Sequence, residues 1–368
     1  MKTTRALLVL FLLFGTHFSL VADTPINAWI KPGSGDWHDQ TAWSLGVLPA
    51  EDQTIMLTNQ GWKAIAIRAV TAQEFASSLN VSSVIVSGYT DSFNVLLLNY
   101  AGTDVPLRAA NGLSIYAGGQ VQNLSSSLIV DSGSLTVSNS NFIQVGGVVV
   151  TTNAWLRLNN GGYYLTNGLL QGGQVNLGLT TSASFVQDGG AASMSSLRVG
   201  AIGYPGGGTS VYELVNGWLY VSGNLTLEAQ SASAVFNQRG GTNFADVLQL
   251  QPPLAGSPVY YNLYGGMFTA NSAFIDGDGN ASYFNQTGGS VFITNTLALR
   301  GGTATEHART NRTINFLAGP CPRGLSTSTV IAVTPSILKA MVPRASRKTF
   351  IWAAAAVTWA TSTCTAAR

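Results

Sequence analysis

The sequence predicts an all-β protein built as a single-stranded parallel β-helix, or β-solenoid, behind an N-terminal tryptophan-rich capping segment. Three observations predict this fold: a repeat of about 24 residues, short β-branched runs between glycine and asparagine turns, and a charged fraction of only 9%. Periods of about 20–50 residues are typical of solenoids and propellers. Regular short strands with turn signals are typical of all-β folds.

Each repeat begins with an aromatic residue and ends in glycine, and successive aromatics lie 21, 27, 24, 25 and 23 residues apart. A propeller blade needs four strands and about 40–50 residues. Twenty-four residues instead give two or three short strands with their turns, which is one turn of a parallel β-helix. The segments are YLTNG at Tyr164, FVQDGG at Phe185, YELVNG at Tyr212, FNQRGG at Phe236, YNLYGG at Tyr261 and FNQTGG at Phe284.

Each turn is predicted to run as aromatic strand, glycine corner, strand, bend and strand, with glycine supplying the positive φ of the corner. We expect the aromatics to stack in one buried column at about 5 Å, one strand spacing. Asparagine follows the aromatic in three consecutive repeats and predicts a hydrogen-bonded amide ladder; the alternative is a row of turn-compatible polar residues. The residues concerned are Phe185, Tyr212, Phe236, Tyr261 and Phe284 for the column, Asn237, Asn262 and Asn285 for the ladder, and Gln187, Gln238 and Gln286 two positions after the aromatic.

The composition argues against a disordered chain and against a nucleic-acid-binding protein. Hydrophobic residues make up 46% of the chain, whereas disordered chains combine low hydrophobicity with high net charge. The formal net charge is +2, but all 16 acidic residues precede position 307. The repeat region is therefore acidic, which argues against nucleic acid as a partner.

Residues 1–22 are predicted to be a signal peptide. Lys2 and Arg5 precede the apolar run Ala6–Phe14, and cleavage is expected after Ala22. The alternative is a membrane anchor, but a span of about 30 Å needs about 20 apolar residues. We therefore expect a secreted or cell-surface protein with no transmembrane span.

Residues 23–106 are predicted to form the tryptophan-rich cap and the first strands. Four tryptophans fall within residues 27–62, at Trp29, Trp37, Trp43 and Trp62. The pattern from Trp37 and Trp43 through Gly46, Pro49 and Asp52 resembles the W…GSGDW…W..G..P…D module that opens many secreted bacterial β-solenoid proteins, including autotransporter-like and β-strand-repeat surface proteins. The resemblance covers about 35 residues and implies a solenoid start and a surface or secreted role. We expect Trp37 and Trp43 to cover the first turn; a carbohydrate-binding platform is the alternative.

The repeats are assigned to residues 107–302, and residues 303–368 form a basic, unpatterned tail. Residues 307–368 carry eight basic residues, no acid and both cysteines, Cys321 and Cys364. One hypothesis is that this tail was translated after a frameshift or a gene truncation and is disordered. The other is a natural basic tail that binds a wall or membrane.

The sequence predicts no catalytic, cofactor-binding or metal site. His38 lies between Asp36 and Asp39 but is interpreted as a turn or surface residue. The run from Asp276 to Asn280 resembles half of a calcium loop, yet Ala281 and Thr287 stand where that loop needs Gly and Glu. Asp188 and Arg239 are expected on turns too far apart to pair.

These observations favour a non-enzymatic secreted or cell-surface solenoid, adhesin-like or structural, with extracellular polysaccharide or cell-surface components as partners and no cofactor. A polysaccharide-active hydrolase or lyase is one alternative, although glycoside hydrolysis needs carboxylates that face one groove and the acids of the repeats are scattered. A truncated autotransporter passenger is the other.

Overall fold

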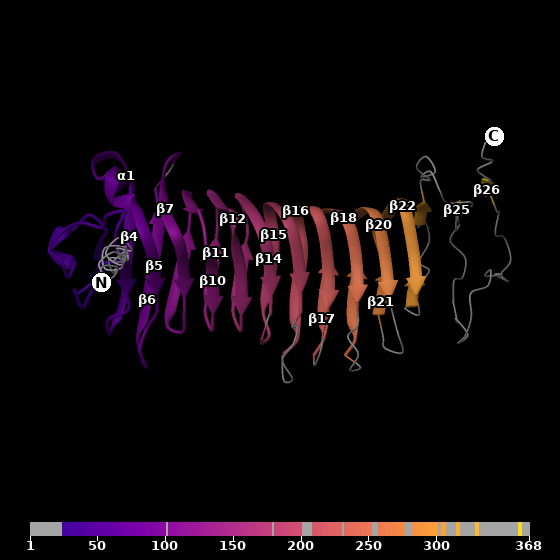
Figure 1. The fold of residues 1–368 in the computed structure, drawn as a ribbon, viewed down its shortest axis with the longest axis horizontal. Helices are drawn as coiled ribbons and strands as arrows, with labels where there is room; N and C mark the ends of the chain where they lie inside the picture. Colours follow the sequence, from indigo (N-terminus) through magenta and orange to yellow (C-terminus); the bar gives the residue numbers. More distant parts are fainter. Residues whose placement is uncertain are drawn as a thin grey trace, which may run out of the picture.

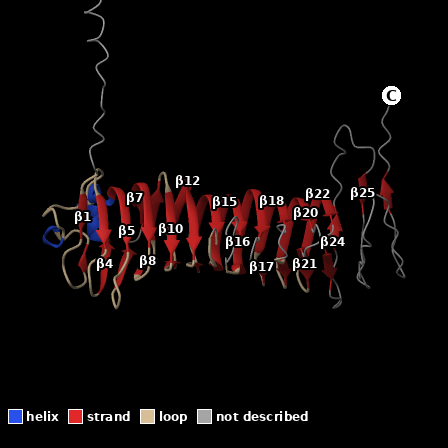
Figure 2. Ribbon diagram, turned by 60° about the horizontal axis from the view of Figure 1, so that its bottom comes forward, coloured by secondary structure: helices blue, strands red, loops and turns tan. Residues whose placement is uncertain are grey.

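The chain forms a rod of about 10 stacked turns of β-strand (Figure 1). This computed structural model describes residues 24–300, apart from 101, 179, 201–207, 230–231, 252–256 and 277–281, together with the short strands 303–306, 314–316, 328–330 and 360–362. The one described α-helix, α1 (Ala69–Glu74), and the 3-10 turns η1 (Gln40–Ala42) and η2 (Ala76–Leu79) lie near the N-terminal end of the stack (Figure 2). The predicted β-solenoid is therefore confirmed.

Each turn contributes one stretch of strand to each of three parallel ladders, here called the aromatic, middle and closing faces in chain order. The aromatic face contains β2 (Gly35–Asp36), β4 (Trp62–Arg68), β6 (Phe93–Asn99), β8 (Gly119–Asn123), β11 (Asn141–Gln144), β13 (Gly162–Leu165), the starts of β15 (Ser184–Val199) and β16 (Ser210–Glu228), β17 (Ala234–Gln238), β19 (Val259–Leu263), β21 (Ser282–Gln286) and β23 (Thr303–Glu306).

The other two faces share several long strands that bend between them. The middle face contains the starts of β5 (Asn80–Val86), β7 (Gly102–Ile115), β12 (Val148–Asn159), β14 (Leu169–Leu177), β18 (Thr242–Gln251), β20 (Met267–Asp276) and β22 (Ser290–Arg300), the middle of β15 and β16, and all of β9 (Ser126–Val130) and β24 (Ile314–Phe316). The closing face contains β1 (Ile26–Ala28), β3 (Thr54–Leu57), β10 (Ser134–Ser138) and the ends of the strands shared with the middle face. The predicted order within a turn is confirmed.

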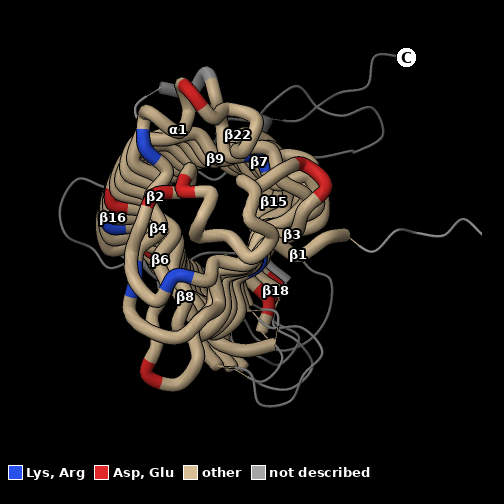
Figure 3. The backbone as a smooth tube through the Cα atoms, turned by 90° about the vertical axis from the view of Figure 1, so that its left-hand side faces the viewer, with Lys and Arg blue, Asp and Glu red and all other residues tan. Residues whose placement is uncertain are grey.

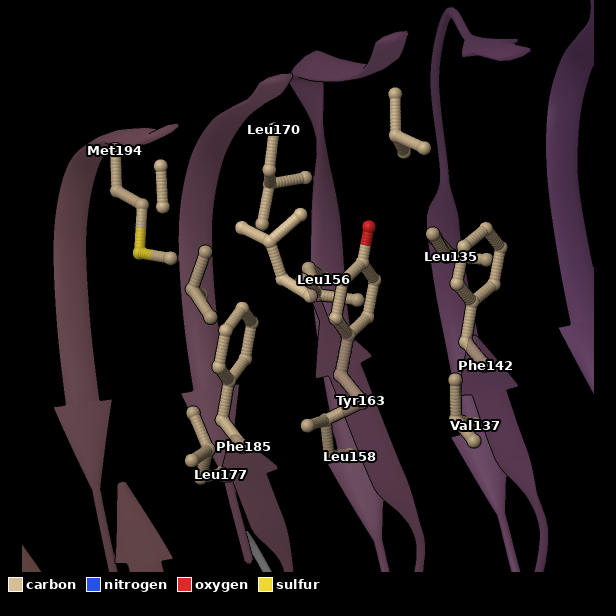
Figure 4. Packing of buried hydrophobic residues seen from close by; sticks show 14 of the residues in the cluster. Leu135, Val137, Phe142, Leu156, Leu158, Tyr163, Leu170, Leu177, Phe185 and Met194 are labelled. Atoms are coloured by element: carbon tan, nitrogen blue, oxygen red, sulfur yellow. The ribbon is translucent and has the colours of Figure 1, made fainter. Parts of the chain in front are cut away.

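A column of buried rings runs along the inner side of the aromatic face (Figure 4). Neighbouring rings lie 4.7–5.0 Å apart with interplanar angles of 3–11°. The predicted column is confirmed and extends two turns further towards the N-terminus. Its members are Phe142, Tyr163, Phe185, Tyr212, Phe236, Tyr261 and Phe284.

The structure corrects the first aromatic of the repeat. The sequence predicts that this repeat begins at Tyr164, but the Tyr164 side chain is 36% exposed, and the adjacent Tyr163 is fully buried in the column. Successive side chains of a strand point to opposite faces, so a shift of one residue exchanges inside for outside. The earlier turns continue the column with the aliphatic side chains of Ile65, Leu96 and Val121.

Phenylalanine and tyrosine alternate strictly along the column, and the residue two positions later alternates between glutamine and leucine. Each tyrosine hydroxyl donates a hydrogen bond of 2.6–2.7 Å to the glutamine Oε1 of the preceding turn. Each of these glutamines donates from Nε2 to backbone carbonyls at the glycine corner. The true repeat is therefore two turns, and the glutamines bind tyrosines rather than one another. The pairs are Tyr163–Gln144, Tyr212–Gln187 and Tyr261–Gln238.

The glycine corner between the aromatic and middle faces requires a positive φ and a very close approach of successive turns. Gly217 and Gly241 have φ of 94° and 65°. A Cβ on Gly241 would lie 2.5 Å from the carbonyl oxygen of Gly217. Any larger residue would therefore clash with the backbone of the neighbouring turn, which explains why glycine recurs here.

Three tryptophans form the core of the N-terminal segment. Trp43 packs edge-to-face against Trp29 and Trp37, with ring centroids 5.2 and 5.1 Å apart. Trp37 and Trp43 are almost fully buried, and their indole nitrogens donate to the carbonyls of Ser78 and Trp37. Their predicted burial is confirmed. Trp62 differs, because it lies on the outer side of β4 and is 74% exposed.

Parallel pairing continues through β23 and β24 beyond residue 302, and β25 (Ser328–Val330) pairs with β26 (Ala360–Ser362) in an antiparallel ladder. In register with Phe284, the next turn has Ala304, so the alternation of phenylalanine and tyrosine ends there. The predicted signal peptide and most of residues 303–368 lie outside the described residues.

Candidate ligand-binding surface

Charged residues are few along the rod, as Figure 3 shows. The side chains of the five described ion pairs are partly exposed, so these are surface pairs. Within the described ranges, no group of three or more His, Cys, Asp or Glu side chains could hold a metal ion. The pairs are Lys31–Asp39, Arg68–Asp36, Arg108–Asp131, Arg198–Glu228 and Arg239–Glu213.

His38 has a packing role in the cap. Its Nδ1 lies 3.0 Å from the Thr71 hydroxyl, and its ring stacks on Phe75 with centroids 5.1 Å apart. The neighbouring carboxylates bind elsewhere: Asp39 pairs with Lys31, and the hydrogen bond from that ammonium group lowers the pKa of Asp39. The structure therefore does not gather His38 and its acidic neighbours around one point.

The acidic residues singled out in the repeats remain separate. Asp276 ends β20, and the rest of the calcium-like run lies in the undescribed interval 277–281. Asp188 is exposed and lies in register with Asn216. Arg239 binds Glu213 of the adjacent turn, a pair that sequence reasoning missed.

An amide ladder crosses the outer side of the aromatic face. Asn285 Nδ2 donates to Asn262 Oδ1 at 2.9 Å, and Asn262 Nδ2 donates to Asn237 Oδ1 at 2.9 Å. Asn237 Nδ2 donates in turn to Glu213 Oε2 at 2.8 Å. The predicted asparagine ladder is confirmed, and Glu213 ends it because a carboxylate only accepts hydrogen bonds.

The ladder uses only part of each amide. A carboxamide has two N–H donors and two oxygen lone pairs. Asn237 and Asn262 each spend one donor and one lone pair on their neighbours. Each half-buried side chain therefore keeps one donor and one acceptor, repeated once per turn.

Aromatic rings flank the ladder on both sides. Tyr260 and Tyr283, which precede the buried column residues, stack with centroids 5.1 Å apart and an interplanar angle of 10°. On the other side Arg239 lies over the Tyr264 ring at 5.3 Å, and Tyr264 is 45% exposed. The surface combines flat apolar rings with neutral hydrogen-bonding groups.

A second strip of apolar side chains lies around the glycine corner, on the outer side of the middle face. Trp218 and Tyr220 are 69% and 47% exposed, and Tyr220 stacks on Phe244 of the next turn at 5.1 Å. Met267 is exposed two turns beyond Trp218. Contiguous exposed apolar side chains mark interaction sites more often than single ones. The i, i+2 spacing in WLY could have indicated this strip from the sequence.

An open groove of about 310 Å³, lined by both polar and apolar groups, lies at the edge of the aromatic face. Asn160 Nδ2 donates to Asn139 Oδ1 at 2.7 Å, and the Ser182 hydroxyl donates to Asn160 Oδ1 at 3.2 Å. The side chains that line the groove are small and uncharged, and the asparagines of the amide ladder are also uncharged. The groove is lined by Asn141, Asn160, Gly161, Gly162, Ser182, Ala183, Ser184, Thr209 and Val211.

Comparison with known proteins adds no relative: no family model matches the chain, and neither a curated protein nor a solved structure matches it. The resemblance of the N-terminal segment to autotransporter-like surface proteins therefore stays a prediction.

Proposed function

We propose that this protein is a non-enzymatic secreted or cell-surface rod with an adhesin-like or structural role. The observation that carries the proposal is the alignment of outward side chains from turn to turn. The amide ladder and the stacked pairs Tyr260–Tyr283 and Tyr220–Phe244 each place like groups one strand spacing apart. A surface of this kind suits adhesion to an extended or repetitive partner.

The continuity of the core supports this role. The buried ring column and the Tyr–Gln pairs tie each turn to the next along the rod. Solenoid stability comes from such nearest-neighbour interfaces, and the extended surfaces of solenoids are commonly used for binding. No described helix has both the length and the apolar character needed to cross a membrane.

The non-enzymatic part of the proposal is tested with the purified protein and a panel of plant and algal polysaccharides, with and without Ca²⁺. We expect no release of reducing ends or unsaturated products. Product release on any polysaccharide would replace the proposal with the hydrolase or lyase alternative.

Export is tested separately. The full chain should appear outside the cytoplasm, and a variant with Lys2 and Arg5 replaced by Glu should accumulate inside the cell, because the positive region of a signal peptide is needed for export. Retention of the unaltered protein in the cytoplasm would contradict a secreted or surface role.

A further inference from the structure

We propose that the outer side of the aromatic face, from β16 to β21, binds a linear neutral polysaccharide that lies along the rod axis. This inference rests on the proposed function and names the partner of that surface. The binding groups are Asn237 and Asn262 of the amide ladder with the flanking rings of Tyr260, Tyr283 and Tyr264.

The period of the surface fits a polymer of sugar rings. Adjacent parallel strands are about 4.8 Å apart, and the ladder repeats its amide once per strand through bonds of 2.9 Å. One pyranose unit advances an extended polysaccharide by a similar distance. Successive sugars can therefore meet successive turns without a change of register.

The hydrogen-bonding capacity of the ladder matches hydroxyl groups. Asn237 and Asn262 each keep one amide N–H and one lone pair after the ladder bonds are made. A hydroxyl group both donates and accepts, so it can bind both remaining functions of one amide. Carboxylate or phosphate groups only accept, and they would leave the amide lone pairs unmatched.

The flanking rings supply the apolar part of the site. Ligand sites combine aromatic side chains with a small number of placed polar groups. Tyr260 and Tyr283 stand beside the ladder on one side, and Tyr264, held under the Arg239 guanidinium, stands on the other. Tyr260 and Tyr283 stack on each other from turn to turn, so their ring edges border the ladder. The C–H groups of sugar rings can pack against these apolar edges, while the sugar hydroxyls reach the amides.

The charge of the surface favours a neutral ligand. Arg239 is the basic side chain beside the ladder, and it is neutralised by Glu213, which it contacts through Nε. Glu213 also accepts the last ladder bond from Asn237. An acidic polysaccharide would thus gain no unpaired cation and would meet a carboxylate.

Binding is measured by affinity electrophoresis and titration calorimetry of the purified full chain with neutral β-linked glucan, mannan and xylan oligosaccharides, and with a polyuronate for comparison. We expect at least one neutral oligosaccharide to bind and the polyuronate to bind at least about tenfold more weakly. Tyr260→Ala with Tyr283→Ala should weaken that binding about tenfold or more, as removal of central aromatic contacts does. Tyr116→Ala, a 44% exposed tyrosine outside this surface, should change it less than about twofold.

Tyr264→Ala provides a second variant on the opposite side of the ladder, and unchanged melting temperatures show that each variant is folded. Failure of every neutral glycan to bind overturns this inference while leaving a non-catalytic, exported rod intact. An equal loss of glycan binding in the Tyr116 variant would also overturn the inference. So would concentration-dependent self-association that Tyr260→Ala with Tyr283→Ala abolishes, because it would assign the surface to a second copy of the chain.

Discussion

At the scale of single residues, the buried tyrosines form the side-chain hydrogen bonds that join one turn to the next inside the core. Tyr163, Tyr212 and Tyr261 are completely buried, and burial raises the pKa of each hydroxyl well above its ordinary value. Each stays neutral and donates to a buried glutamine carbonyl. A buried acceptor that loses its donor costs about 1–3 kcal/mol. A pairing of turns that leaves one of these glutamines without its tyrosine is therefore less stable.

The Tyr212–Gln187 bond can be tested by a double-mutant cycle. Tyr212→Phe should destabilise the fold by about 1–3 kcal/mol, because Gln187 Oε1 is left without a donor. With Gln187→Leu added, the total should fall short of the sum of the single changes by about 1–2 kcal/mol. Chemical denaturation provides the free energies of unfolding.

Gln144→Leu is the matched control, because Gln144 binds Tyr163, which lies two turns before Tyr212 in the column. Its effect should add to that of Tyr212→Phe within about 0.5 kcal/mol. Equal coupling energies in both cycles would show that the coupling between Tyr212 and Gln187 does not come from their hydrogen bond.

The tyrosines also predict loss of stability in alkali. Their pKa values are raised above the unfolded value of about 10, so their contribution is full below pH 10 and is lost as the pH rises further. Tyr100, whose pKa is raised to about 12 by burial, acts in the same direction. Lys63 acts in the opposite direction, since burial lowers its pKa.

The measurement is the urea midpoint between pH 8 and pH 11. The unaltered protein should lose stability above pH 10, and a variant with phenylalanine at all three column tyrosines should lose markedly less. Parallel pH curves for the two proteins would exclude the column tyrosines as the cause.

At the scale of elements, the N-terminal segment closes the open end of the stack. The first strands, β1 and β2, pair with β3 and β4 of the next turn. The outer edge of β1 is covered by the segment that follows η1: Trp29 and Trp43 form an antiparallel bridge, and Ser44 N–H donates to the Ala28 carbonyl. Unpaired strands and an exposed core favour end-to-end association. The cluster of Trp29, Trp37 and Trp43 fills the interior beside them.

Trp37→Ala with Trp43→Ala should lower the melting temperature and promote aggregation, because removing one buried tryptophan costs about 3–5 kcal/mol. Trp62→Ala is the control, since Trp62 is 74% exposed. Calorimetry and light scattering measure the two effects. If the double variant keeps its stability but loses glycan binding, these tryptophans form a carbohydrate-binding platform and not a cap.

The sequence predicts the elements better than their contacts. The aromatic–glycine period is enough to predict the turn, the ring column and the asparagine ladder. It misplaces the first ring, because Tyr163 and Tyr164 are adjacent and only the register distinguishes them. It misses the Glu213–Arg239 pair and the Trp218 strip, because connections of unequal length hide which residues of neighbouring turns face each other.

At the scale of the whole molecule, the central claim is that successive repeats stack in parallel register along one axis. Gln122, Tyr164, Asn262 and Asn285 all occupy the position after the column residue and point outward. Tyr164 and Asn262 are four turns apart, and Gln122 and Asn285 are seven turns apart. Distances between such positions should therefore depend on the number of turns and not on the number of residues.

The most direct measurement uses spin labels on cysteines introduced in these pairs, after Cys321 and Cys364 are replaced by serine. At about 4.8 Å per turn, the backbone separations are roughly 19 Å for Tyr164–Asn262 and roughly 34 Å for Gln122–Asn285. Dipolar spectroscopy should show two narrow distributions whose means differ by roughly 15 Å. Broad distributions, or means that do not increase with the number of turns, would contradict the parallel solenoid.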